Sequence, residues 1–278
     1  MWQKSYDNSP TLYLVPTPIG NLDDMTFRAI DTLKNVDVVF AEDTRVSSDL
    51  FKKFDIKNKL VSLHNFNEDS SKEKVIEFLK VGSNVAIITD RGTPLISDPG
   101  YKSVKCISDM GYNVVSLPGA TAFVPALTSS GLPTDHFLFY GFLNSNSNKC
   151  ELELRELSNY EYTMIFYEAP HRFYKTMELL FKVFGDRIVS VSREISKKFE
   201  SVYRGNISDL IKLDAEIKGE IVIVVSGNID VMADNDLSIK DAVDNYVRNG
   251  ITVMNAIKMV SKDRKIPKNE VYKEYHGG

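Results

Sequence analysis

The segment NVAIITDRGTPLISDPG at residues 84–100 joins a short apolar run to a loop of glycine, proline and small polar residues. The apolar run, 84–90, is rich in β-branched residues and has the length of a buried strand. Glycine and proline in the loop let the backbone approach a ligand closely and fix the path of the chain. In open α/β sheets, ligands bind beyond the carboxyl ends of the strands. The segment therefore predicts a strand that ends at a binding loop.

Comparable apolar runs recur through the first half of the chain, with amphipathic helical patterns between them. One helix is expected at 71–81, where Val75, Ile76 and Leu79 share a face and Lys74 points outward. This alternation favours βαβ units in a mostly parallel, twisted sheet whose two faces are covered by helices. The strands are expected at 11–16, 37–42, 59–64, 84–90 and 113–117.

The second half contains another set of strands around a long helix expected at 171–184. These strands are expected at 136–143, 163–168, 188–195, 199–205 and 220–226. Because the run at 199–205 adds a strand without a crossover helix, this half is expected to form a mixed sheet.

The chain changes character after Gly227, where a polar connector at 228–236 is followed by helical patterns. Two helices are expected at 238–248 and 251–264, and a third is allowed from Pro267. From Ile239 onward the chain carries eight basic and five acidic residues, whereas the whole chain has a net charge of −4. The expected fold class is α/β, with two α/β domains and a small helical C-terminal extension. The expected limits are 11–118, 119–227 and 237–278.

The composition of the 278 residues is that of a soluble globular protein, with 43% hydrophobic and 26% charged residues. The net charge excludes a global cationic field, so a nucleic-acid role would need a local basic patch. The two cysteines exclude a disulfide framework and a cysteine-rich zinc site. The N-terminal residues lack the apolar core of a signal peptide, and no apolar run approaches the roughly 18 to 20 residues of a membrane span. We expect a reduced, cytoplasmic protein without a membrane partner.

Three loops at expected strand ends share this glycine- and proline-rich character. They read TPIGN at 17–21, DRGTPLISDPG at 90–100 and PGATA at 118–122. Each alone is compatible with a rigid turn, but three at one sheet edge favour a ligand site. The sequence lacks GxGxxG after the first strand, GxxxxGK[ST] and GxSxG, which argues against an NAD-binding domain, a P-loop NTPase and an α/β-hydrolase. The four histidines lack a zinc-ligand spacing, so no metal site is expected.

Three charged clusters also lie at expected strand ends. They read AEDTR at 41–45, EAPHR at 168–172 and REISK at 193–197. Each has a structural interpretation beside a functional one: Asp43 or Thr44 could cap the next helix, Pro170 suits a helix start, and the third cluster could be an ion-pair network. From the residues alone, we expect an α/β enzyme with a crevice for a ligand, a charged surface for a second substrate and a small basic helical tail.

The order of these motifs resembles that of one bacterial family. The motifs are TPIGN, AEDTR, DxGTPxISDPG, PGx[ST]A, SGLPT, FxGF, YEAPHR and REx[ST]K, and they run from about Leu12 to Ser226. The chain resembles the ribosomal RNA small subunit methyltransferase I family, which methylates the 2′-oxygen of a cytidine in 16S ribosomal RNA. The C-terminal helices also resemble that family's extension. The resemblance implies the tetrapyrrole-methylase fold, S-adenosylmethionine in the crevice between two α/β domains, a homodimer, and the small ribosomal subunit as partner.

The resemblance also implies roles for individual residues. The cofactor is expected to contact Asp90, Gly92, Thr93, Thr121, Ala122, Tyr167, Gly219 and Glu220. The residues expected to meet RNA phosphate or the target nucleotide are Arg45, His171, Arg172 and Lys197. In the transfer, Glu168 is the expected general base, and His171 or Arg172 is expected to stabilise the developing alkoxide.

The sequence departs from the family pattern at three places near these motifs. Arg91 stands where the family has alanine, Val46 where it has histidine, and Pro16 where it has a small residue. The guanidinium of Arg91 could point outward to RNA or crowd the cofactor, and Val46 cannot make the polar contact of an imidazole.

Two other functions stay open at this point. A small-molecule methylase of the tetrapyrrole type would keep the fold, although the basic tail and YEAPHR argue against it. A non-catalytic ribosome-assembly protein would result if Arg91 compromised cofactor binding. For the RNA methyltransferase, the negative net charge favours a folded subunit over free RNA as the target, and the tail at 239–278 is expected to supply part of the contact.

Overall fold

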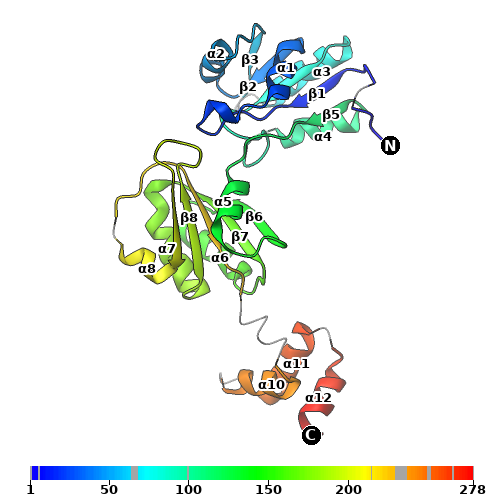
Figure 1. The fold of residues 1–278 in the computed structure, drawn as a ribbon. Helices are drawn as coiled ribbons and strands as arrows, with labels where there is room; N and C mark the ends of the chain where they lie inside the picture. The colour runs from blue at the N-terminus through cyan, green and yellow to red at the C-terminus, as the bar shows by residue number, and fades with distance from the viewer. Residues whose placement is uncertain are drawn as a thin grey trace.

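The computed structural model describes residues 2–5, 7–63, 68–98, 100–213, 215–228, 237–248, 252–264 and 266–277. Within these residues the chain forms two five-stranded sheets, both covered by helices, and a group of three helices near the C-terminus (Figure 1). The expected fold class is confirmed. The chain passes from the first sheet to the second between β5 (Asn113–Ser116) and α5 (Phe123–Ser130). The domain limits given above stay a prediction.

The first sheet is parallel throughout, in the order β3-β2-β4-β1-β5. Its other strands are β1 Thr11–Leu14, β2 Val38–Ala41, β3 Leu60–Ser62 and β4 Val85–Ile88. Each strand expected in this half is present but shorter. β1 ends early because Pro16 has no N–H to continue the ladder. On the side of β1 that faces β4, the Val15 N–H still donates a 3.0 Å hydrogen bond to the Ile87 carbonyl. The end of the strand expected at 59–64 lies outside the described residues.

Helices cover both faces of this sheet because successive strand residues point to opposite sides. They are α1 Phe27–Asn35, α2 Thr44–Lys53, α3 Glu68–Lys80 and α4 Tyr101–Asp109. Val39 of β2 packs with Leu33 of α1 and Phe51 of α2. Its neighbour Phe40 packs on the other face with Leu79 of α3, the helix expected at 71–81.

The second sheet is mixed, in the order β6-β7-β10-β8-β9. Its strands are β6 Phe137–Phe142, β7 Thr163–Glu168, β8 Ile188–Arg193, β9 Ser201–Asn206 and β10 Ile221–Val225. β6 is parallel to β7, whereas β10 is antiparallel to both β7 and β8, and β9 is antiparallel to β8. The strand expected at 199–205 is β9, which lies at one edge of the sheet and runs antiparallel to β8.

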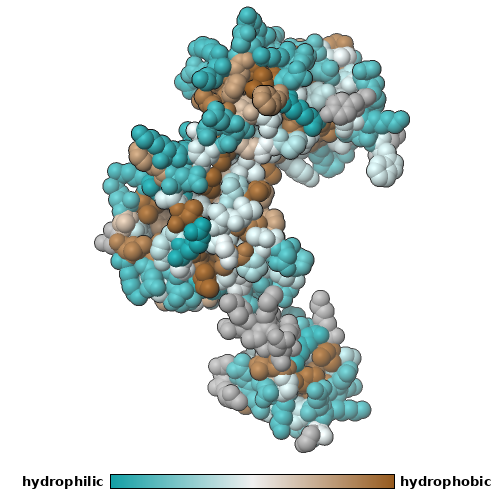
Figure 2. Space-filling model, viewed as in Figure 1, coloured by the Kyte–Doolittle hydropathy of each residue, from teal (hydrophilic) through white to brown (hydrophobic). Residues whose placement is uncertain are grey.

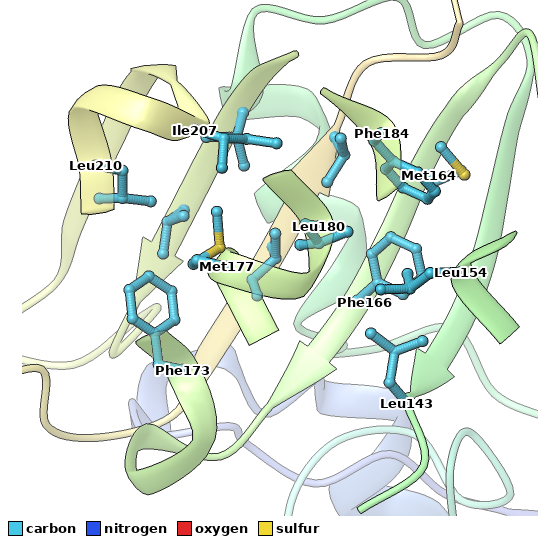
Figure 3. Close-up of a cluster of buried hydrophobic side chains, with 14 of the residues drawn as sticks. Leu143, Leu154, Met164, Phe166, Phe173, Met177, Leu180, Phe184, Ile207 and Leu210 are labelled. Carbon is cyan, nitrogen blue, oxygen red and sulfur yellow. The ribbon is translucent and has the colours of Figure 1, made fainter. Parts of the chain in front are cut away.

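The main core of the second domain lies between this sheet and three helices (Figure 3). These helices are α6 Ser147–Leu157, α7 Phe173–Phe184 and α8 Ile207–Lys212. Phe166 of β7 packs there with Leu154 of α6 and Leu180 of α7. On the other face of the strand, Ile165 packs with Leu127 of α5. β7 is thus buried on both sides, which explains its continuous apolar sequence.

The C-terminal helices form a small unit with its own core. They are α10 Ile239–Arg248, α11 Val253–Asp263 and α12 Lys268–His276, and they lie apart from the second domain in Figure 1. One side chain from each helix, Val243, Ile257 and Val271, is fully buried in that core. The Tyr246 hydroxyl donates a 2.7 Å hydrogen bond to Asp263, which ties α10 to α11. The connector expected at 228–236 lies outside the described residues except for its first residue.

No helix in the described parts of the chain is long and apolar enough to cross a membrane.

Candidate active site

A cavity of about 410 Å³ lies between the two α/β domains, beyond the carboxyl ends of the first sheet's strands. The first domain contributes the loop after β4. The second domain contributes the turn before α5, the ends of β6 and β7, and the start of β10. The apolar part of its wall includes Ile19, Ile96, Phe142, Tyr167, Ile195 and Val222. A concave, mostly apolar site with a few polar groups is typical of small-molecule binding.

The three glycine- and proline-rich loops meet at this cavity, as expected. Thr17 and Gly92 exchange two backbone hydrogen bonds of 2.9 and 3.0 Å, which join the first loop to the second. The Thr93 hydroxyl donates a 3.0 Å hydrogen bond to the Ala120 carbonyl, which joins the second loop to the third. The loops therefore form one connected wall rather than three separate turns.

The loop after β4 has a strained backbone. Leu95 and Ser97 have φ values of 73° and 64°, in the left-handed region that side chains other than glycine rarely adopt. Such strain costs about 1 to 3 kcal/mol per residue and is concentrated at functional sites. In this loop it accompanies a turn that places the next side chain, Asp98, in the wall of the cavity.

Asp98 is the most strongly perturbed acid of this wall. Burial raises the pKa of its carboxyl to about 6, although a hydrogen bond with the Thr89 side chain has the opposite effect. The nearby carboxylates of Glu42 and Asp90 raise the pKa further. Burial also raises the pKa of Tyr167 on the opposite side of the cavity. Sequence reasoning missed Asp98, although it is the acidic residue in the quoted ISDPG segment of the binding loop.

Most residues expected to contact the cofactor line the main cavity. Those that do are Gly92, Thr93, Thr121, Ala122, Tyr167 and Glu220. Asp90 instead lines a smaller adjoining cavity, and its Oδ1 accepts a 3.0 Å hydrogen bond from the Asp43 N–H. Gly219 has a φ of 87° and lies against the Glu194 side chain, so close that a Cβ there would be 2.4 Å from a carboxylate oxygen. A role of these residues in binding a cofactor stays a prediction.

The structure brings Glu168 and Arg172 together but does not place His171 with them. The Glu168 side chain is fully buried and accepts hydrogen bonds from the Thr176 hydroxyl at 2.5 Å and the Ala169 N–H at 2.7 Å. Arg172 donates to the same carboxylate at 3.1 and 3.2 Å, while His171 is exposed. Both Glu168 oxygens are thus engaged by donors. This arrangement favours a positioning role for Glu168 over the proton-accepting role expected from the sequence.

Charged side chains from both domains meet at the edge of the main cavity. Arg91 of the first domain forms an ion pair with Glu220 of the second. The Lys197 ammonium lies 2.9 Å from Glu220 and 2.8 Å from Glu194. Lys197, which was expected to contact RNA, is therefore held between two carboxylates. The ion-pair network, one of the two interpretations of the third charged cluster, is present.

Arg45, which was expected to contact RNA, is exposed, and its role in binding stays a prediction. Its side chain is 90% exposed and forms a 2.6 Å ion pair with Asp43. Asp43 also caps α2 by accepting a 2.8 Å hydrogen bond from the Arg45 N–H, so the capping interpretation of this residue is confirmed. The bonds from Arg45 lower the pKa of Asp43 to about 2.

Among the described residues, no three histidine, cysteine, aspartate or glutamate side chains are grouped so that they could hold a metal ion.

Comparison with known proteins identifies the family. The model of the tetrapyrrole (corrin/porphyrin) methylases matches residues 11–211. The chain is 47% identical to ribosomal RNA small subunit methyltransferase I of Bacillus subtilis (strain 168), over 95% of this chain and 94% of that protein. It is 42% identical to the protein of the same name from Halalkalibacterium halodurans, over 99% and 98% of the two chains.

Solved structures show the same fold at low sequence identity. A cobalt precorrin-4 methyltransferase has a TM-score of 0.59 and 18% identity, and covers 78% of this chain and 94% of its own. The uroporphyrin-III-C-methyltransferase of Thermus thermophilus has a TM-score of 0.56 and 20% identity, over 80% and 97% of the two chains. Fold and sequence agree, and the chain belongs to the tetrapyrrole methylase family and, within it, to the ribosomal RNA small subunit methyltransferase I family.

Proposed function

We propose that the protein transfers a methyl group from S-adenosylmethionine to the 2′-oxygen of a cytidine in 16S ribosomal RNA, on the assembled small subunit. The observation that carries the proposal is near-full-length similarity to relatives named ribosomal RNA small subunit methyltransferase I, in a chain whose DRGTPLISDPG, PGATA and YEAPHR segments line the cavity between the domains. A structural neighbour, a uroporphyrin-III C-methyltransferase, is described as complexed with S-adenosylhomocysteine, the product form of this cofactor.

The main cavity fits the cofactor in size and chemistry. Its volume of about 410 Å³ lies within the range of small-molecule sites, about 300 to 1,000 Å³. Ile19, Ile195 and Val222 offer apolar contacts, and the hydroxyls of Thr93 and Thr121 offer hydrogen bonds. Gly92 has no side chain, so its backbone borders the cavity directly. When bound, the cofactor supplies an electrophilic methyl group on a sulfonium.

The chain's own contribution is to orient the ribose and accept its proton. A ribose hydroxyl is a weak nucleophile, and a positioned base of suitable pKa increases its reactivity. Asp98 lies in the cavity wall, and its carboxyl has a pKa of about 6, so it is largely ionised at neutral pH. With the cofactor bound, the 2′-oxygen would take the methyl group from the sulfonium, whose sulfur would keep the electrons of the broken carbon–sulfur bond. The 2′-proton passes to the Asp98 carboxylate and then to water.

Contacts with RNA come from local basic groups rather than from the net charge. Arg45 is exposed in the first turn of α2, and Lys258, Lys262 and Lys273 are exposed on the C-terminal helices. Figure 2 shows one face of the helical unit as largely hydrophilic. Such contacts release counterions, so affinity should fall steeply with salt. The homodimer and the cytoplasmic location stay predictions.

The experiment that tests the proposal incubates the protein and labelled S-adenosylmethionine with small subunits from a strain that lacks this gene. Naked 16S RNA serves as the comparison. Alkali-resistant label at one cytidine, with preference for the subunit, is the expected result. Binding of the cofactor without RNA labelling would favour a small-molecule acceptor. Failure to bind the cofactor would favour the non-catalytic assembly role.

A further inference from the structure

A second cavity of about 270 Å³ adjoins the main one, and Arg91 lines both. It lies within the first domain, between the loop after β1, helix α2 and the end of β4. Thr17, Pro18 and Gly20 of the TPIGN motif line it, and so do Val46 and Ser47, which directly follow the AEDTR motif. None of these five residues lines the main cavity, so the second cavity is a separate candidate site.

One side of the second cavity is apolar. Pro18, Leu22 and Val46 line it, and Leu22 and Val46 are 41% and 47% exposed. Val46 stands where the resemblance expects histidine, so this wall is more apolar than the family pattern implies. A flat aromatic ring inserted here would cover both side chains, and enzymes that act on a flipped-out base hold it between aromatic or apolar side chains.

Asp90 is one of the polar residues that line the second cavity, with Ser47, Asp49 and Thr89 among the others. Its side chain is half-buried, and its Oδ1 accepts the Asp43 N–H at 3.0 Å. Among the described residues no donor engages Oδ2, so this oxygen can accept a hydrogen bond from a ligand in the cavity. Carboxylates accept hydrogen bonds from the exocyclic amine of cytosine. Uracil carries an acceptor oxygen at that position, which a carboxylate would repel.

We propose that the second cavity holds the base of the target nucleotide and that Asp90 selects cytosine by accepting a hydrogen bond from its exocyclic amine. This inference rests on the proposed function and adds the subsite that reads the base. Because Arg91 borders both cavities, a nucleotide seated in this way has its ribose beside the main cavity, on the side where the 2′-oxygen is expected to react. Lys53, also in the wall, is exposed and can meet a phosphate.

The decisive variant is Asp90→Asn, which keeps the shape and the Oδ1 acceptor for the Asp43 N–H. Its substrates are small subunits carrying either cytidine or uridine at the target position. We expect the variant to lose about 10- to 100-fold in kcat/KM on cytidine, the effect of a good base contact, and to gain relative activity on uridine. The affinity for S-adenosylmethionine, measured by calorimetry, should not change. The control is Asp55→Asn, an exposed acid at the far end of α2 paired with Lys57, which should behave as the wild type.

A binding measurement keeps the inference testable even if the wild type methylates no RNA. Cytidine 5′-monophosphate is titrated into the full chain, and methyl NMR signals of Leu22 and Val46 report on the second cavity. We expect these signals to shift, to shift less with uridine 5′-monophosphate, and to lose the difference in Asp90→Asn. The inference would be overturned if only the Ile195 signal in the main cavity shifted. It would also be overturned if Asp90→Asn kept the wild-type difference between the shifts caused by the cytidine and the uridine nucleotide. RNA labelling absent in the wild type would overturn the proposed function instead.

Discussion

The proposed role of Asp98 makes the rate of methyl transfer depend on the ionisation of one carboxyl group. Its carboxyl must be ionised to accept a proton, and burial raises its pKa to about 6, with Glu42 and Asp90 adding to the shift. The methyl-transfer rate should therefore fall as the pH drops through about 6. In Asp98→Asn we expect kcat to fall about 10²- to 10⁴-fold and the acidic limb of the pH profile to disappear. Single-turnover rates across this pH range provide the measurement.

The control for that variant is Asp109→Asn on α4, where the carboxylate is exposed and paired with Lys105 at 2.7 Å. It should keep both the rate and the acidic limb. An Asp98→Asn enzyme that retained the limb at the same pH would assign the titration to another group and exclude Asp98 as the proton acceptor.

Glu168 is predicted to act through stability rather than through proton transfer. Glu168→Gln removes the buried charge that partners Arg172, and the single amide oxygen can replace only one of the two oxygens that accept from Thr176 and Ala169. Breaking a buried pair costs about 3 to 5 kcal/mol, and we expect the lower end because Arg172 also donates to the Leu143 carbonyl at 2.9 Å. Urea unfolding measures the loss. A general base would behave differently, with a collapse of kcat in a protein of unchanged stability.

At the scale of elements, the sequence predicted what depends on local patterns. The apolar runs predicted the strands, and Asp43 was correctly considered as the cap of α2. The hydrogen-bond partners of Glu168 and Lys197 could not be predicted from local patterns. Thr176 reaches Glu168 from the next helix, and Glu220 reaches Lys197 across 23 positions, so only the packed fold brings them together. A base needs a free oxygen, and local sequence does not show which oxygens are already bonded.

The loop after β4 gives a prediction about a whole element. Gly92 has a φ of 85°, and a Cβ there would approach Ile19 to 3.4 Å at the cavity wall. Gly92→Ala should cost about 1 to 2 kcal/mol in folding and should also weaken cofactor binding. Gly82→Ala is a matched control because Gly82 has a φ of 91° and nothing within 4 Å of its would-be Cβ. Both variants should lose similar stability by thermal unfolding, but calorimetry should show reduced cofactor affinity in Gly92→Ala alone.

Across the whole molecule, Arg91 and Glu220 connect the two α/β domains at the cavity edge. Both side chains are more than half exposed, so the pair should contribute less than about 1 kcal/mol to folding. Its location predicts a larger effect on exchange of the bound cofactor, because the pair joins the two domains at the edge of the cavity. Arg91→Ala should leave the thermal midpoint almost unchanged and raise the dissociation rate of S-adenosylhomocysteine in stopped-flow measurements. Arg155→Ala, which breaks a pair within α6, should change neither, and an unaltered rate in Arg91→Ala would refute the idea.

The C-terminal helices are expected to bind RNA without supporting the rest of the fold. Their core is formed by their own side chains, such as Val243 and Ile257. Replacing the exposed Lys258, Lys262 and Lys273 by alanine in the full chain should therefore leave the thermal midpoint and cofactor affinity unchanged. Subunit affinity should fall, and the slope of log K against log salt should shrink by about 0.7 to 0.9 for each phosphate that the variant no longer neutralises. The same affinity and slope as in the wild type would show that the subunit is recognised by the α/β domains alone, through groups such as the exposed Arg45 beside the second cavity.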